Sequence, residues 1–300
     1  MLTASWLLAL VLAAAPGEVR LAAVGDVLVA RTVPQRLAAH GPAWFWERLG
    51  DAWTGADLRF ANLECPVCTD GRPVLKRFCF RAVPEQARAV LQAGAVEVVA
   101  LANNHAWDWG RTGLAQTLGH LRAWGIAAAG AGRGRAQAVA PVRLTRSGLR
   151  VAVVAYTDWT PEDYIPSDDE PSLATLDETT LSAELGSAHA EADVLVVSVH
   201  WGNEYVDQPT DRQRSLAHAM VEAGADLVLG HHPHVTQPVE VYRDRPIAYS
   251  LGNAIFDRSG PRVSNGLLLS VRLGRDAATV ERQVALTIEN ARSVPAATGR

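Results

Sequence analysis

The sequence predicts an α/β fold in which buried strands alternate with amphipathic helices. Short apolar runs rich in β-branched residues recur along the chain, polar residues or glycines follow them directly, and helical patterns separate several of them. Uninterrupted apolar runs are typical of strands covered on both faces, and their alternation with helices indicates βαβ units. We therefore expect a layered arrangement around a largely parallel or mixed sheet.

Nine apolar runs are predicted as strands. Seven lie at 19–24, 57–61, 96–102, 150–155, 193–199, 226–229 and 246–251, and two more, at 266–272 and 279–286, are expected to be edge strands that complete a sheet. Helical patterns that each end before a glycine predict helices at 84–93, 112–124 and 211–223. The acidic, proline-bearing stretch 160–179 is expected to be a long loop or lid, and the tail 293–300 to be disordered.

Composition limits the function. The chain has 300 residues, 48% of them hydrophobic, so it can bury a substantial core. Its formal net charge is -4 and its pI is about 6.1, which argues against a nucleic-acid partner, because such proteins are usually basic. We expect one large domain over 18–290.

The first residues suggest export. Residues 1–15 are apolar and end in small residues, but they fall short of the roughly 20 residues of a membrane-spanning helix. A signal peptide or N-terminal anchor over 1–17 is therefore predicted, with an exported or membrane-associated extracytoplasmic location. The absence of Lys and Arg from this segment keeps an uncleaved anchor open.

Three cysteines leave two alternatives open. In an oxidising compartment Cys68 and Cys79 could form a disulfide and leave Cys65 over; otherwise all three are free thiols.

Polar side chains follow the predicted strands where each strand ends. Asp26 follows the first, Asn62 and Glu64 the second, Asn104 and His105 the third, and three histidines between 231 and 234 the sixth. His200 follows the fifth strand in the same way. In open α/β sheets, sites form outside the carboxyl ends of the strands. Carboxylate, amide and imidazole groups suit divalent Mn, Fe or Zn, and two such ions can share a bridging carboxylate and activate a water.

Taken singly, most of these residues have a structural alternative. Asp26 suits a turn or a helix cap, Glu64 a surface charge, Asn104 a turn and His200 a buried core position. The histidines at 231–234 are harder to explain without a metal. Three charged imidazoles within four residues would repel one another, and a cation is the natural stabiliser.

Seven ordered segments resemble the capsule-synthesis CapA family, which is associated with bacterial poly-γ-glutamate synthesis and looks like a branch of the calcineurin-like metallophosphoesterases. The segments are Gly25–Arg31, Ala61–Val67, Lys76–Glu85, Leu101–Gly110, Val197–Tyr205, Gly230–Glu240 and Tyr249–Asp257. The resemblance implies a layered metallophosphatase-like sandwich of mixed sheets flanked by helices. It also implies one or two divalent metal ions.

The resemblance assigns roles to the candidate residues. Glu64 matches the bridging carboxylate, and His105 matches the histidine that protonates a leaving group or orients a phosphate. Asp108 would orient the His105 ring if the segment is helical. The implied metal ligands are Asp26, Glu64, Asn104, His200, His231, His232 and His234.

The substrate side of the site is less specific. Lys76, Arg77 and Arg81 suit an anionic substrate, either a phosphate or a polyglutamate carboxylate, or else form a solvated basic strand. Trp201 suits packing or a wall facing the substrate. The candidate substrate-binding residues are Asn62, Lys76, Arg77, Arg81, Trp201, Glu204 and Asn253.

The sequence also departs from the metallophosphoesterase pattern. Leu28 stands where the first motif, Asp-x-His, has its histidine, which would weaken one metal site. Glu64 replaces the usual aspartate of the second motif. The last motif is stretched, so that either His231 or His232 is a ligand, whereas His234 fits in both alignments.

Two functions follow. The first is an exported metallohydrolase that acts on a phosphoester or on an amide in a γ-linked polymer, with His105 as the acid. The alternative is a non-catalytic, metal- and polymer-binding accessory of a capsule synthase, whose membrane subunits would be its partners.

Overall fold

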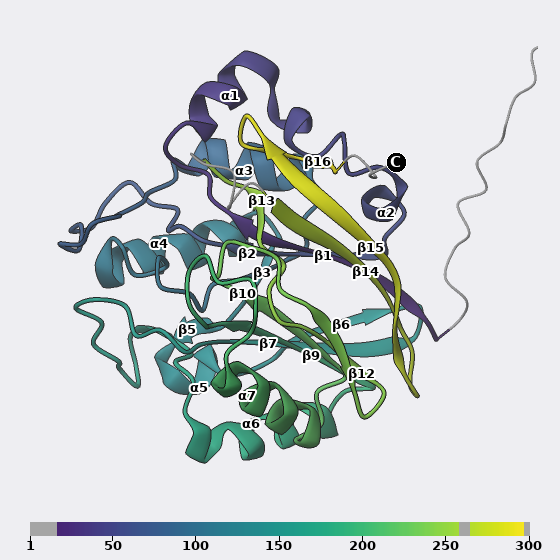
Figure 1. The fold of residues 1–300 in the computed structure, drawn as a ribbon. Helices are drawn as coiled ribbons and strands as arrows, with labels where there is room; N and C mark the ends of the chain where they lie inside the picture. Colours follow the sequence, from purple (N-terminus) through teal and green to yellow (C-terminus); the bar gives the residue numbers. More distant parts are fainter. Residues whose placement is uncertain (1–16, 258–264, 297–300) are drawn as a thin grey trace, which may run out of the picture.

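The computed structural model describes residues 17–257 and 265–296, so the predicted leader at 1–17 lies outside them except for its last residue. Two sheets pack face to face and helices cover both outer faces, which gives four layers (Figure 1). Within the described ranges, no helix has the length and apolar character needed to cross a membrane.

The first sheet has eight strands and a parallel centre. Its order is β16-β15-β14-β1-β2-β3-β4, with β13 also paired to β1. The parallel members are β1 (Val19–Val27), β2 (Leu58–Leu63), β3 (Val98–Ala100), β4 (Ala127–Ala129) and β13 (Asn253–Ile255). An antiparallel extension consists of β14 (Asn265–Leu273), β15 (Ala278–Glu289) and β16 (Arg292–Pro295).

The second sheet has six strands in the order β11-β12-β10-β9-β7-β6. Its parallel members are β7 (Leu149–Thr157), β9 (Val194–His200), β10 (Leu227–His231) and β12 (Arg245–Ala248), and its antiparallel edges are β6 (Val142–Arg146) and β11 (Val239–Tyr242). A separate antiparallel pair joins β5 (Ala131–Arg133) to β8 (Pro171–Leu173).

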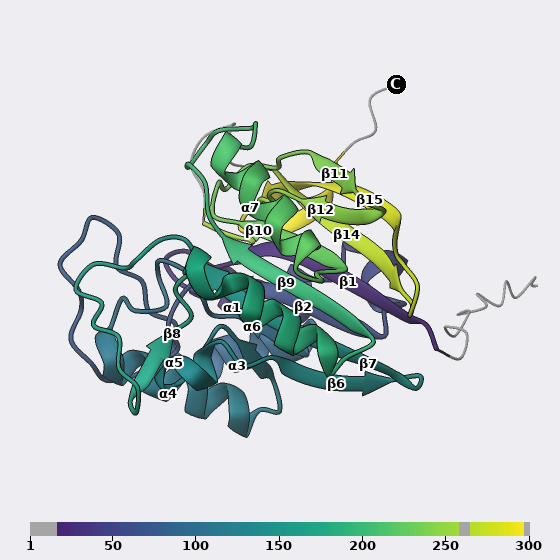
Figure 2. The same ribbon diagram turned by 90° about the horizontal axis from the view of Figure 1, so that it is seen from below.

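Helices occupy the two outer layers (Figure 2). On the first sheet lie α1 (Val33–His40), a 3₁₀ turn (Pro42–Phe45), α2 (Asp51–Thr54), α3 (Pro84–Ala93) and α4 (Gly110–Ala123). On the second sheet lie α5 (Gly134–Ala138), α6 (Glu178–Ala190) and α7 (Asp211–Glu222).

The core between the sheets consists of side chains that alternate along the strands, such as Leu21 and Phe60 from the first sheet and Val196 and Leu229 from the second. Because both sheets are also covered outside, the central strands are buried on both faces. This is why their sequences are almost uninterrupted apolar runs.

The predicted α/β class and its layered arrangement of mixed sheets are confirmed, and helix α3 has the predicted bounds. Three local predictions are wrong. Strands β14 and β15, which were predicted as edge strands, lie inside the first sheet between β1 and β16. Residues 293–296 are ordered, because β16 pairs with β15, while 297–300 lie outside the described residues. The expected loop at 160–179 contains β8 and the first two residues of α6.

The direction of the parallel strands determines where the site lies. Strands β1, β2 and β3 run parallel to one another, as do β9 and β10, so their carboxyl ends meet at one edge of the sandwich. Strand β13 packs closely against the end of β1, where the backbone of Gly25 contacts that of Gly252. A Cβ atom on Gly25 would lie 1.9 Å from the carbonyl oxygen of Gly252. The close contact of these two backbones therefore requires glycine at position 25.

Candidate metal centre

Ligand-type side chains from both sheets meet at this edge. They form two groups, Glu64 with His200 and His232, and Asp26 with Glu64 and His234, and in each group the ligand atoms lie within 4.8 Å of one another. Every member is buried. Glu64 belongs to both groups, which is the placement expected of a carboxylate that bridges two ions.

The group around His200 includes an amide. The Nε2 atom of His200 lies 3.0 Å from the Asn104 Oδ1 atom, 3.1 Å from the His232 Nδ1 atom and 3.8 Å from the Glu64 Oε1 atom. Ligands bound at about 2.1 Å to one ion lie roughly 3 Å apart when they are adjacent around it. The two shorter separations fit this geometry.

The second group centres on His234. Its Nδ1 atom lies 3.1 Å from the Asp26 Oδ2 atom, and its Nε2 atom lies 3.7 Å from the Glu64 Oε1 atom. The Oδ1 atom of Asn253 is also 3.1 Å from the His234 Nδ1 atom. His231 contributes less directly: its Nδ1 atom is 3.5 Å from the Asp26 Oδ1 atom, and it belongs to neither group.

The buried charges fit a cation. Among the described residues, neither carboxylate oxygen of Glu64 has a hydrogen-bond partner. Burial, and next the charge of Asp26, raise the pKa of Glu64 well above its usual value. An unpaired buried carboxylate is costly, and a divalent ion would compensate it.

The histidines are suited to bind such an ion. Burial lowers the pKa of His200 well below its usual value, and burial followed by the charge of His234 lowers that of His232 to about 3. Both rings are therefore neutral at pH 7, which is the form that coordinates metals.

The loop after β10 holds its histidines in an unusual backbone conformation. His232 and His234 have φ values of 97° and 57°, in the left-handed region that residues other than glycine rarely adopt. Such strain is typical of functional sites, where surrounding structure fixes it. Here it directs two imidazoles of one short loop into two different groups.

A chain of hydrogen-bonded asparagine side chains orients the ligands. The Nδ2 atom of Asn62 donates to Asp26 Oδ1 at 2.8 Å, and the Nδ2 atom of Asn103 donates to Asn62 Oδ1 at 3.1 Å. The Oδ1 atom of Asn103 accepts the backbone N–H groups of His105 and Ala106. Asn103, which is not among the residues that the sequence predicted for the site, thus links the Asp26 ligand to the loop of His105.

His105 lies beside the two ligand groups and is held by Asp108. Its Nδ1 atom is 2.9 Å from Asp108 Oδ2; because a carboxylate only accepts, this nitrogen carries the hydrogen. The segment is a turn that precedes α4 rather than part of the helix. Burial lowers the pKa of His105, although the hydrogen bond with Asp108 raises it.

The side chain of Lys76 packs, largely covered, against the same carboxylate. Its Nζ atom lies 2.5 Å from Asp108 Oδ1 and donates to the backbone oxygen of Asn104 at 2.8 Å, with 8% of the side chain exposed. Glu162 is 3.5 Å away. These partners engage the ammonium group of Lys76, so it stabilises the His105 turn in addition to facing the cleft.

Lys76→Met is expected to lower the free energy of unfolding by about 3–5 kcal/mol, because it leaves Asp108 as a buried charge without its cation. Urea denaturation measures this, with Arg77→Met as the matched control, since Arg77 is the exposed neighbour. Equal stability of the two variants would show that Lys76 does not stabilise the turn.

A cleft of about 360 Å³ opens onto the two ligand groups. Asn104, His105 and His232 form its inner part, and residues of three loops complete it, namely Lys76, Arg77, Phe78, Trp159, Thr160, Glu162, Asn203 and Glu204. Thr160 and Glu162 come from the stretch that the sequence predicted as a loop or lid. The indole of Trp159 lies 5.0 Å from the His232 ring and donates to the Gly202 oxygen.

Other predicted substrate residues lie elsewhere. Trp201 is fully buried, packs against Tyr249 and donates to its backbone oxygen, and Asn62 is buried behind Asp26. Arg81 stacks over Trp109 with its guanidinium carbon 4.0 Å from the ring centroid, and it does not line the cleft.

All three cysteines are free thiols.

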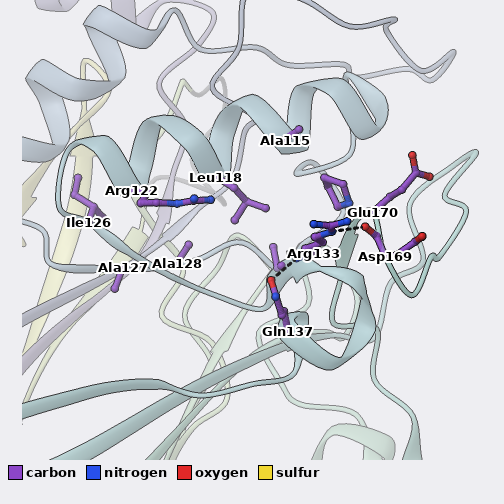
Figure 3. Close-up of a pocket in the computed structure, with 13 residues that line it drawn as sticks. Ala115, Leu118, Arg122, Ile126, Ala127, Ala128, Arg133, Gln137, Asp169 and Glu170 are labelled. Atoms are coloured by element: carbon purple, nitrogen blue, oxygen red, sulfur yellow. Dashed lines mark hydrogen bonds between the residues drawn. The ribbon is translucent and has the colours of Figure 1, made fainter.

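A larger hollow of about 600 Å³ lies between α4 and α5 (Figure 3). Its lining includes none of the candidate ligands among the described residues. Arg133 lines it, and its Nε atom donates to the backbone oxygen of Asp169. The chemistry is therefore placed in the smaller cleft.

The fold is metallophosphatase-like, as predicted. The fold resembles the NAD nucleotidase NadN of Haemophilus influenzae, with a TM-score of 0.51 and 11% identity over 94% of this chain and 60% of that one. It also resembles a 5'-nucleotidase precursor of Thermus thermophilus, with a TM-score of 0.50 and 13% identity over 93% and 54%.

The chain belongs to the family described as bacterial capsule synthesis protein PGA_cap, which matches residues 20–258. It is 31% identical to the capsule biosynthesis protein CapA of Bacillus anthracis over 91% of this chain and 68% of that protein. It is 32% identical to the PGA biosynthesis protein CapA of Bacillus subtilis over 84% and 67%. The predicted family is thereby confirmed.

Proposed function

We propose that this chain is an exported, metal-dependent hydrolase of the capsule-synthesis family, acting on a phosphoester or on the γ-linked amide of an anionic polymer. The observation that carries the proposal is Glu64, a buried carboxylate shared by two ligand groups beside a cleft. When bound, a pair of divalent ions supplies electrophilic catalysis and lowers the pKa of a water.

The residues of the chain supply the remaining chemistry. Asp108 fixes the His105 ring with Nδ1 as the donor, so Nε2 is the nitrogen that exchanges a proton with the reacting group. Because burial lowers the pKa of His105, its resting ring is in the neutral form, whose Nε2 can accept a proton; a bound anion beside it favours the charged, donating form. Arg77, at the cleft, provides a cation for a phosphate or carboxylate.

A second candidate is a non-catalytic accessory that binds metal and polymer beside membrane subunits of a capsule synthase. Leu28 favours it, because the position of a usual ligand is apolar and fully buried. In this case the cleft would hold a polymer chain without turning it over.

Turnover separates the two candidates. The purified protein, loaded with manganese, iron or zinc, is assayed against phosphomonoesters, phosphodiesters and γ-glutamyl peptides. Metal-dependent release of phosphate or glutamate supports the hydrolase. Retention of poly-γ-glutamate at equilibrium with no product favours the accessory.

Chelation is expected to lower thermal stability. An ion present at about a thousandfold above its dissociation constant stabilises the folded state by about 4 kcal/mol. In a chain of this size that corresponds to a shift in Tm of about 10 °C. Differential scanning calorimetry with and without chelator measures the shift. An unchanged Tm, with no metal found by mass spectrometry, would contradict the metal centre.

A further inference from the structure

The two ligand groups differ in how many ligand-type side chains have been assigned to each. His200 has Glu64, His232 and the amide oxygen of Asn104 near it, whereas His234 has Asp26 and Glu64. Leu28, where a histidine was expected, is fully buried in the core of the outer layer, and its backbone N–H donates to the Ile255 oxygen. The residue after β1 therefore provides no ligand.

Strand β13 brings another side chain to the ligand group of Asp26, Glu64 and His234. It pairs parallel with β1 in a register that sets Asn253 opposite Asp26. Residues opposite each other in neighbouring strands point to the same face of a sheet, so the two side chains lie together. The contact of Gly25 with Gly252 brings the backbones close enough for this.

The amide of Asn253 is oriented by its own hydrogen bond. Its Nδ2 atom donates to the His234 backbone oxygen at 3.2 Å, which identifies the nitrogen and turns Oδ1 towards the metal group. That Oδ1 atom is 3.1 Å from His234 Nδ1, the same distance that separates this nitrogen from Asp26 Oδ2. Asn253 is fully buried.

We propose that Asn253 Oδ1 is a metal ligand and completes the group of Asp26, Glu64 and His234. Each group then contains Glu64, imidazole and one amide oxygen, with Asn253 on one side and Asn104 on the other. In the competing arrangement, Asn253 accepts a hydrogen from His234 Nδ1 and only orients the ring, whose Nε2 atom binds the ion.

This inference rests on the proposed metal centre and is tested by metal content and spectroscopy. Asn253→Ala and Asn253→Asp are compared with the wild type and with Asn265→Ala, an exposed asparagine of the neighbouring strand β14. Bound metal per chain is counted by mass spectrometry, and cadmium NMR reports the donor atoms around each ion separately.

We expect Asn253→Ala to retain one ion and to bind the second at least about 100-fold more weakly, with one cadmium resonance lost or strongly shifted and the other unchanged. Asn253→Asp keeps an oxygen donor and should keep both ions. Two ions bound to Asn253→Ala with wild-type affinity and cadmium shifts would overturn the role of Asn253. A wild type without bound ions would instead overturn the metal centre itself.

Discussion

Glu64→Gln is expected to abolish binding of both ions, because this carboxylate belongs to both ligand groups and an amide is a neutral, weaker ligand. Loss of a single ion would mean that Glu64 does not bridge. Metal content per chain measures the effect, and Glu281→Gln is the control, since Glu281 is exposed on β15.

The same variant should behave differently without metal. Glu64 has no hydrogen-bond partner among the described residues, and burial disfavours its charged form, so the neutral amide of Glu64→Gln removes no favourable contact. In chelator, the Tm of Glu64→Gln is expected to match or exceed that of the wild type; with metal it is expected to be lower by about 10 °C. A lower Tm in chelator would indicate that Glu64 has a structural role of its own.

His105→Ala is expected to lower kcat by about 10²–10⁴-fold while both ions stay bound. His105 lines the cleft and is held by Asp108, but it is a member of neither ligand group. Steady-state kinetics on the best substrate found, together with metal content, measure the two properties. His40→Ala, on the exposed end of α1, is the control.

The outcome of His105→Ala also separates the two proposed functions. A hydrolase loses turnover and keeps its metal, as an acid–base residue requires. If metal is lost as well, His105 is a ligand. If the variant retains full turnover, the proton is transferred by another group, and His105 positions the substrate at most.

Much of the site could be predicted because it follows from strand direction. Asp26, Glu64 and His200 come at or directly after parallel strands, so their convergence required only the fold class. The choice between His231 and His232 required the structure, because it depends on the backbone conformation after β10. His232 joins the ligand groups, and His231 lies 5.9 Å from the Phe60 ring, towards the core between the sheets.

Other parts depend on contacts that no local pattern reveals. Lys76 lies in a long irregular segment between β2 and α3, and its pairing with Asp108 is a tertiary contact. Strand β13 is three residues long, and its register with β1 depends on two glycines far apart in sequence. Helix α6 escaped prediction although Leu181, Leu185 and Ala188 have helical spacing after the Asp177 cap.

The split of the ligands between the two sheets has a consequence for the order in which the molecule is assembled. The first sheet provides Asp26, Glu64 and Asn104 early in the chain and, in the proposed arrangement, Asn253 from β13, whereas the second sheet provides none before His200. A growing chain that has emerged only as far as β7 carries three of these ligands and cannot enclose an ion. Tight metal binding therefore comes last, after the sheets have packed together, and it favours finished molecules over truncated ones.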